Sequence, residues 1–408
     1  MSPDARKAWA MACISASAAF LVGGYEFVRS TTASLFLEAF GSSAMPYAMT
    51  LVPVLMAVLI YLYGKVLSRL GPLKTLQLSF GLTALAFALA YAAVKSGSRT
   101  AVAALYVFAE AYIVILVEQF WAFIDSTLDP SKAKVYNGPI LGGASLGPIL
   151  AGTLLSRFAV SLGSETFILL SGAVLLPTAA LAYAAYKLAG EPQPSAAERE
   201  GRLGAVHLRL ILDTPVLLLI ALVVSLSQVY ATMTNLRLYQ LLEVAIPLKD
   251  ARSAYLGAFW TQCNAVAFLM QFVLTPLLLK RLPLKALLMG IPAIHAATAL
   301  ALLLHPSLGS AALALMLFKG LDYSVFRASK EVLYIPLSYD ARYRAKQVVD
   351  AFNYRFSKGA TAGLLSLVQS LLGVLPGWAY PAAALAAAAA WLAAAAPLGE
   401  QAPTAPKA

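Results

Sequence analysis

The chain is poor in charged residues. Only 12% of its 408 residues are Asp, Glu, Lys or Arg, whereas 60% are hydrophobic, and the mean hydropathy is +0.76. A soluble domain is nearer a quarter charged and half apolar. The composition therefore excludes a water-soluble enzyme of this length and favours a protein built from membrane-spanning helices.

Cysteine and histidine are scarce as well. The two cysteines, Cys13 and Cys263, lie in apolar stretches, and the three histidines, His207, His295 and His305, are far apart in the sequence. These residues make neither a disulfide framework nor a zinc site. No Ser/His/Asp or Cys/His arrangement for nucleophilic catalysis is apparent either. We therefore expect no metal, no cofactor and no enzymatic activity.

In place of these features the chain has a series of long apolar runs. A helix needs about 20 residues to cross the hydrocarbon core of a bilayer. The hydropathy predicts twelve spans, at 8–28, 44–63, 75–95, 100–124, 137–158, 165–187, 214–236, 254–276, 286–304, 309–335, 347–374 and 376–396. The first is not a signal peptide, because it is long and is followed by further spans. The expected fold class is an all-α membrane protein.

The basic residues give the orientation of these spans. With both termini in the cytoplasm, 18 of the 30 Lys and Arg residues fall in cytoplasmic segments and 7 in external ones. Cytoplasmic loops of membrane proteins carry such an excess of Lys and Arg. The net charge of +11 is thus explained by topology, and no nucleic-acid partner is expected.

The chain divides into two similar halves. A polar stretch with Pro, Gly and Glu at 188–213 separates six spans in 1–187 from six in 214–408. The sequence after span 2, GKVLSRLGPLK at 64–74, resembles TPLLLKRLPLK at 275–285 after span 8. Two six-helix halves related by a parallel repeat are the architecture of the major facilitator fold. The chain is expected to be a monomer in the lipid bilayer.

Glycines give two weaker signals. Gly64, Arg69 and Gly71 resemble the first cytoplasmic loop of that superfamily, although Ser68 stands where its Asp belongs. Gly143, Gly147 and Gly152 in span 5 are compatible with the superfamily's antiporter motif or with simple close packing of small residues.

Charged residues inside the predicted spans are few and concentrated. A charge within hydrocarbon is costly and needs a functional or structural reason. Most of these residues lie in spans 1, 4, 7 and 10, the helices that line the central cavity of a major facilitator transporter. Span 10 holds Lys319, Asp322, Arg327, Lys330 and Glu331, span 11 holds Asp350, Arg355 and Lys358, and span 4 holds Glu110 and Glu118.

Two interpretations of these charges remain open. They form internal ion pairs, such as Lys319 with Asp322 or Arg327 with Glu331 on one helix face, or Glu118 with Lys330. Alternatively, the cations bind an anionic substrate, and carboxylates gate the site or carry a proton. The carboxylates considered for gating or proton coupling are Glu110, Glu118, Asp322, Glu331 and Asp350.

The segment 319–337, KGLDYSVFRASKEVLYIPL, resembles the ATP/ADP translocase family of plastids and intracellular bacteria. The shared residues are Lys319, Tyr323, Ser324, Phe326, Lys330, Glu331, Tyr334, Ile335, Pro336 and Leu337. Further matches lie at the end of span 1 (Arg29, Leu35, Gly41, Pro46), in the span-4 region (Glu110, Phe120, Trp121, Ala133, Lys134), in span 7 (Tyr230, Asn235, Leu236) and downstream of this segment (Lys346, Asp350, Arg355, Lys358). The resemblance implies a bacterial inner-membrane transporter. From the charge pattern and the resemblance together, the residues expected to bind substrate are Arg29, Asn235, Lys319, Arg327, Lys330 and Arg355.

Several charged positions depart from the family pattern. Thr32 and Ala33 stand where the family has the Lys and Asp of Leu-Lys-Asp, and Asp322 replaces its Lys before Tyr-Ser. Arg327 replaces an Asp, and Leu238 and Leu241 stand where a Glu and a Lys are expected. The sequence therefore resembles a divergent bacterial member.

Three functions are compatible with this sequence. The first is an alternating-access transporter of an anionic nucleotide or other phosphate-bearing metabolite, with its site between helices 1, 4, 7 and 10. The second is a proton-coupled antiporter of an unrelated small organic solute. The third is a membrane receptor that keeps the fold without transporting. The second predicts pH-driven flux without competition by nucleotides, and the third predicts binding without counterflow in liposomes.

Overall fold

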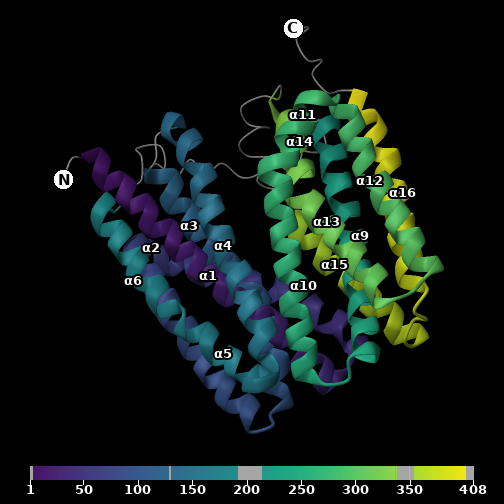
Figure 1. Cartoon of the computed structure of the whole chain (residues 1–408), viewed down its shortest axis with the longest axis horizontal. Coiled ribbons are helices and arrows are strands. Elements are labelled where there is room, and N and C mark those ends of the chain that lie inside the picture. Colours follow the sequence, from purple (N-terminus) through teal and green to yellow (C-terminus); the bar gives the residue numbers. More distant parts are fainter. Residues whose placement is uncertain are drawn as a thin grey trace. The chain divides into compact units, whose positions relative to one another are not determined.

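A computed structural model describes residues 3–127, 130–191, 214–335, 337, 349 and 353–400. Every regular element within these residues is helical (Figure 1). The helices are α1 (Pro3–Phe40), α2 (Met45–Lys95), α3 (Arg99–Thr127), α4 (Pro130–Leu162), α5 (Ser164–Ala173), α6 (Leu175–Ala189), α9 (Pro215–Ala245), α10 (Lys249–Leu269), α11 (Thr275–Arg281), α12 (Leu284–Leu304), α13 (Leu308–Leu321), α14 (Arg327–Tyr334), α15 (Tyr354–Leu372) and α16 (Ala379–Glu400).

Short elements join some of these helices. Ser42–Ala44 (η1) is a 3-10 turn, and Met270–Leu274 (η2) and Asp322–Phe326 (η3) are π-helical turns that continue the helices on either side. Such π-helical turns are rare and occur frequently at functional sites.

The chain is a multi-pass membrane protein. In the described residues ten helical stretches are long and apolar enough to cross a bilayer, which confirms the predicted all-α membrane class. The longest of them, Ser42–Lys95, has 54 residues, far more than the ~20 that one span needs. α15, which carries Arg355 and Lys358, is not among the ten. The count of twelve spans stays a prediction.

Gly71 interrupts the longest stretch. Its φ of 77° and ψ of 171° are not helical, and Pro72 follows. A positive φ is costly for residues with a Cβ, and proline suits the first position of a helix. The backbone N–H of Leu73 donates to the Glu191 carboxylate at 3.1 Å. The second limb of α2 therefore starts anew at Pro72, with an anion at its N-terminus.

The repeat predicted from the sequence contains a second break at the aligned position. Helix α11 ends at Arg281, and Leu282 is extended. Pro283, with φ −64° and ψ 145°, is extended as well and directly precedes α12. Pro283 aligns with Pro72 in the repeat. Proline cannot continue the preceding helix because it lacks an N–H and disfavours helical geometry in the residue before it.

The helices form two compact units. The first contains Met1–Gly41, Leu51–Arg202 and Ile246–Asn264, and the second contains Ser42–Thr50, Leu203–Ala245 and Ala265–Ala408. In the first unit, α1 packs against α3, α4, α5 and α6 (Figure 1). In the second, α9 packs against α13, α15 and α16, and α12 packs against α16. Each unit thus includes a segment from the other half of the sequence.

Candidate functional site

A buried ion pair lies in the middle of α1. Glu26 is only 1% exposed, and the Arg29 guanidinium, one turn further along, donates to its Oε2. The Ser30 hydroxyl donates to Oε1 at 3.2 Å. The three residues share a helix face because they are three and four positions apart. Since an unpaired charge in an apolar interior is very costly, the pairing accounts for the presence of both residues in a membrane helix.

Helix α10 completes this cluster from the other half of the sequence. The Arg29 guanidinium carbon lies 3.8 Å from the centroid of the Trp260 ring, a cation–π contact. One turn later, the Asn264 amide donates to Glu26 Oε2 at 3.3 Å. The Trp260 indole Nε1 is buried and has no hydrogen-bond partner in the described part of the chain. We call Glu26, Arg29, Trp260 and Asn264 the α1–α10 cluster.

Tyr25 connects the α1–α10 cluster to α3. Its ring centroid lies 5.2 Å from the Arg29 guanidinium carbon, and its hydroxyl donates to Glu110 Oε1 at 3.4 Å. The ring of Tyr112 on α3 meets the Tyr25 ring edge-on at 6.4 Å between centroids. Two of the predicted site residues, Arg29 and Glu110, are therefore brought together through a tyrosine.

Glycines make the approach of α10 possible. A Cβ added at Gly257 would meet the Gly152 carbonyl oxygen at 2.9 Å and the Ser156 nitrogen at 3.0 Å. A Cβ at Gly152 would in turn lie 2.8 Å from the Gly257 carbonyl oxygen and 3.5 Å from Glu26 Cγ. These contacts support the packing interpretation of the span-5 glycines, because small residues let two helix backbones come close.

The first turn of α10 holds a separate group of ion pairs. Lys249 Nζ lies 2.7 Å from Glu165 and 3.2 Å from Asp250. Arg252 pairs with Glu38 near the end of α1. These pairs attach the start of α10 to α1 and α5, but partial exposure to solvent limits what each adds to stability.

Span 10 is the other charged region, in the second unit. The π-helical turn η3 begins at Asp322, which is 7% exposed. Before it, Lys319 Nζ lies 3.2 Å from the Tyr323 hydroxyl. After it, Lys330 is 9% exposed, with its Nζ 5.2 Å from the Phe326 ring centroid. Arg327 and Glu331 are exposed. We call Lys319, Asp322 and Lys330 the span-10 block.

The remaining predicted residues are scattered. Asn235 on α9 is half-buried, and its side-chain oxygen is buried without a hydrogen-bond partner among the described residues. Arg355 on α15 is half-buried, and Glu118 on α3 is exposed. Asp350 lies outside the described residues. The proposed pairing of Glu118 with Lys330 stays a prediction.

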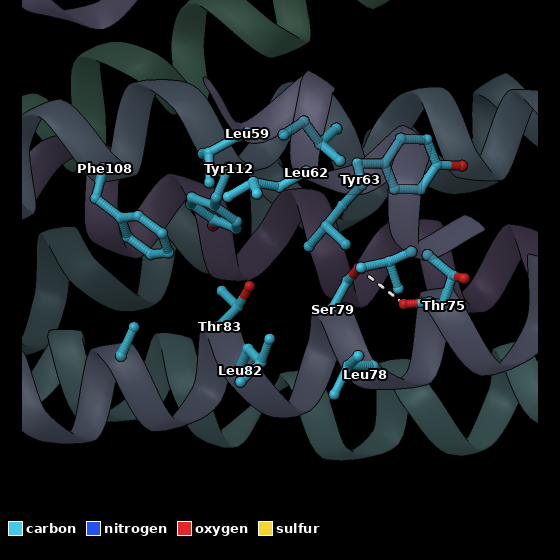
Figure 2. A pocket seen from close by; sticks show the side chains of 14 residues that line it. Leu59, Leu62, Tyr63, Thr75, Leu78, Ser79, Leu82, Thr83, Phe108 and Tyr112 are labelled. Carbon is cyan, nitrogen blue, oxygen red and sulfur yellow. Dashed lines mark hydrogen bonds between the residues drawn. The ribbon is translucent and has the colours of Figure 1, made fainter. Parts of the chain in front are cut away.

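A cavity in the first unit does not coincide with these charges. It has a volume of about 220 Å³ and is lined by both limbs of α2 and by α3 (Figure 2). Leu62, Leu78 and Leu82 make its walls largely apolar, and Ser79 donates a hydrogen bond to the Thr75 carbonyl. None of the predicted substrate-binding residues lines it.

Three members of the α1–α10 cluster, Glu26, Trp260 and Asn264, were not predicted as site residues from the sequence. Glu26 is the only acidic residue of the predicted first span and precedes Arg29 by three positions, which was an available signal for an ion pair. Trp260 and Asn264 carried no such signal, because their partners are more than 200 positions away. A tryptophan in a membrane helix is more often an interface residue.

The C-terminal part of the chain is similar to a known protein family. Residues 290–401 match the family model described as TLC ATP/ADP transporter. This segment resembles the ATP/ADP transporters. It includes the whole span-10 block and Arg355, and the match confirms the resemblance predicted from residues 319–337.

A curated ATP/ADP transporter is also similar over a longer region. The ADP,ATP carrier protein 3 of Rickettsia felis is 26% identical over 328 residues, which are 67% of this chain and 64% of that protein. The chain thus spans 64% of the length of the relative that it matches. Both comparisons point to transporters rather than to enzymes.

Solved structures identify the fold. A bacterial homologue of the iron transporter ferroportin in an inward-facing state has a TM-score of 0.67 at 14% identity, covering 98% of this chain and all of that one. A D-xylose–proton symporter has a TM-score of 0.65 at 13% identity, covering 93% and 96%. A nucleoside transporter has a TM-score of 0.58 at 14% identity, covering 97% and 98%. At these identities the fold alone is shared, and it is that of major facilitator transporters.

Proposed function

We propose that the chain is a secondary transporter that works by alternating access and moves an anionic metabolite of the nucleotide or phosphate-bearing class. The observation that carries this proposal is the ATP/ADP transporter match over residues 290–401, which holds two lysines inside a candidate membrane span. Lys330 is almost fully buried. A buried ionisable residue in a membrane helix is by default a functional residue.

The proposed topology has twelve spans in two six-helix halves joined by the stretch 188–213. Ser42–Lys95 supplies two of the spans, because it breaks at Gly71. α15 supplies a further span with polar and charged residues. The Lys and Arg bias supports cytoplasmic termini in a bacterial inner membrane, and the functional unit is a monomer in the bilayer.

The proposed binding residues are the cations and the amide that the sequence predicted. Lys319, Lys330 and Arg355 bind the anion with charge-assisted hydrogen bonds, joined by Arg29, Asn235 and Arg327. The side-chain oxygen of Asn235 has no hydrogen-bond partner among the described residues and is available to a donor group of a ligand. Asp322, Glu110, Glu118, Glu331 and Asp350 act as gating or proton-carrying groups.

The substrate carries fewer negative charges than ATP. Asp322 is buried within the span-10 block and opposes the binding of a polyanion. Thr32 and Leu241 also lack the positive charge that the family pattern has at these positions. Like charges in a low-dielectric interior repel strongly. A nucleoside monophosphate or a small phosphate ester fits these residues better than a triphosphate does.

The test is thermal unfolding of the detergent-purified protein with nucleotides, inorganic phosphate, pyrophosphate and uncharged nucleosides. A ligand at about one hundred times its dissociation constant stabilises the folded state by ~2.7 kcal/mol. We expect a rise in Tm with phosphate compounds, lost in Lys330→Ala. Lys280→Ala, at an exposed lysine of α11, is the matched control and should keep the full shift.

Two results contradict the proposal. If no phosphate compound raises Tm, a proton-coupled carrier of another small solute becomes the better interpretation. That alternative is favoured by the missing basic residues at Thr32 and Asp322 and predicts pH-driven flux without nucleotide competition. If phosphate compounds bind but proteoliposomes show no counterflow, the chain is a receptor with a transporter fold.

A further inference from the structure

Glu26 is not among the residues predicted to bind substrate or to carry protons, yet it is fully buried in α1. Its side chain is 1% exposed, while that of its partner Arg29 is 17% exposed. The cation is thus the member of the pair that an incoming molecule can reach. The carboxylate behind it is enclosed by α1, α4 and α10.

The partners of Glu26 differ in which protonation state they accept. Arg29 is always charged and stabilises only the carboxylate. The Ser30 hydroxyl and the Asn264 amide now donate to Glu26, but a hydroxyl and an amide can also accept a hydrogen bond. After rotation, either group can accept from a protonated carboxyl. The position therefore accommodates Glu26 in both states, and Arg29 alone of these three requires the charged one.

Arg29 is held in a fixed orientation for an anion. Its guanidinium lies on the Trp260 ring at 3.8 Å and near the Tyr25 ring at 5.2 Å. A planar guanidinium stacked on an aromatic ring keeps its N–H groups directed sideways, where they match a carboxylate or phosphate. The buried Trp260 N–H, which lacks a partner in the described residues, offers a further donor in the same cluster.

We propose that Glu26 couples anion binding to proton uptake. The substrate anion replaces the Glu26 carboxylate on Arg29, and Glu26, left buried without its counter-charge, takes one proton from water. Arg29 stays charged throughout, and the reverse steps release the anion and the proton together. The transporter is then a symporter that carries one proton with each anion. The inference rests on the proposed function, since it requires an anionic substrate.

Among the described residues, the contacts of the cluster with other charged or titratable groups include Tyr25 on α1 and Glu110 and Tyr112 on α3. Gly152 and Asn264, which lie against Glu26, and Trp260, which lies against Arg29, do not titrate near neutral pH. A carboxylate at Glu110 favours protonation of Glu26 over loss of the Arg29 proton.

The first experiment counts protons. Isothermal titration of the detergent-purified protein with inorganic phosphate and nucleoside monophosphates is repeated in buffers that differ in ionisation enthalpy. We expect uptake of about one proton per anion bound in the wild type, beyond that of the ligand itself. Glu26→Gln should bring the uptake close to zero. Glu191→Gln, at the carboxylate that caps the second limb of α2, should leave it at about one.

The second experiment separates coupling from transport. Proteoliposomes are clamped at zero membrane potential and tested for counterflow at equal pH, and then for accumulation driven by a pH gradient. A one-proton symporter accumulates its anion up to about tenfold per unit of pH gradient. We expect Glu26→Gln to retain counterflow and to lose the accumulation. If this variant does not fold, Asn264→Leu keeps the ion pair and should reduce proton uptake by removing an acceptor for the protonated carboxyl.

The outcomes distinguish a failure of the coupling role of Glu26 from a failure of the proposed function. Wild-type counterflow without gradient-driven accumulation, or equal proton uptake by wild type and Glu26→Gln, overturns the role of Glu26 and leaves the proposed function intact. Absence of both anion binding and counterflow in the wild type overturns the proposed function, and the coupling role falls with it.

Discussion

The α1–α10 cluster and the span-10 block are two charged regions built in different ways. In the cluster, Glu26 and Arg29 are adjacent on one helix, but their other partners, Trp260 and Asn264, arrive from a helix in the other half of the sequence. In the span-10 block the charged residues follow one another on a single stretch of chain, and the π-helical turn sets their directions. A local motif such as the span-10 block can therefore be recognised from sequence, whereas a cluster assembled by packing cannot.

Removing Arg29 should have the largest effect on the free energy of unfolding, because it breaks the buried ion pair of the α1–α10 cluster. Arg29→Leu leaves Glu26 buried without its cation, and breaking a buried ion pair costs about 3 to 5 kcal/mol. The double variant Glu26→Gln with Arg29→Leu should recover most of this loss, because no lone charge remains. Denaturant unfolding in detergent measures both free energies of unfolding.

Arg157→Leu serves as the control for this prediction. Arg157 is an exposed arginine of α4, and surface substitutions usually change stability by less than about 0.5 kcal/mol. A loss in Arg29→Leu no larger than that of the control would show that the Glu26–Arg29 pair does not stabilise the folded state.

A methyl group at the α4–α10 crossing should disturb the cluster and spare the span-10 block. Gly257→Ala places a Cβ 2.9 Å from the Gly152 carbonyl oxygen, and overpacking of this kind costs about 1 to 3 kcal/mol. Gly290→Ala on α12 meets no atom within 4 Å and should be neutral or stabilising, because alanine favours a helix. Thermal unfolding of the two variants tests the contrast, which would vanish if α4 and α10 were not in contact.

Neutralising Asp322 should change the span-10 block and leave the α1–α10 cluster unaffected. Asp322→Asn removes the buried negative charge of the span-10 block and should tighten nucleotide binding about tenfold, or ~1.4 kcal/mol, without affecting the α1–α10 cluster. Asp322→Glu keeps the charge and is the matched control. Titration with ADP and with a nucleoside monophosphate measures the change, and the gain should be larger for ADP. Equal or weaker binding by Asp322→Asn would show that Asp322 does not oppose the anion.

Much of the fold was predictable because each membrane-spanning helix needs a continuous apolar run, which is visible in the sequence. The apolar runs gave the all-helical class, and the aligned prolines at Pro72 and Pro283 marked both helix breaks. The charged residues of the span-10 block could also be recognised from the sequence, because they lie close together on one stretch of chain. Its resemblance to the ATP/ADP transporters rested on one ungapped segment, and the family match includes that segment.

Other features depended on contacts that no local pattern encodes. Lys249 and Arg252 were counted as external basic residues, but they pair with Glu165 and Glu38 on other helices. Hydropathy alone did not reveal that Asn264 donates to Glu26, because an Asn in an apolar helix has many potential partners. The π-helical turn at Asp322–Phe326 was also missed, since its residues have no distinctive composition.

That π-helical turn has a consequence for the relation between Lys319 and Lys330. In an uninterrupted α-helix of 3.6 residues per turn, these lysines would be about three turns apart and would share a face. A π-helical turn takes up roughly one extra residue, so Lys330 is rotated by about 100° from that face. Deleting a single residue within Asp322–Phe326 would restore a regular α-helix and leave Lys330 in the same direction, whereas rewinding this turn as α-helix with all its residues kept would rotate Lys330 back onto the face of Lys319. The winding of this helix therefore shapes its chemistry as much as the identity of its residues does.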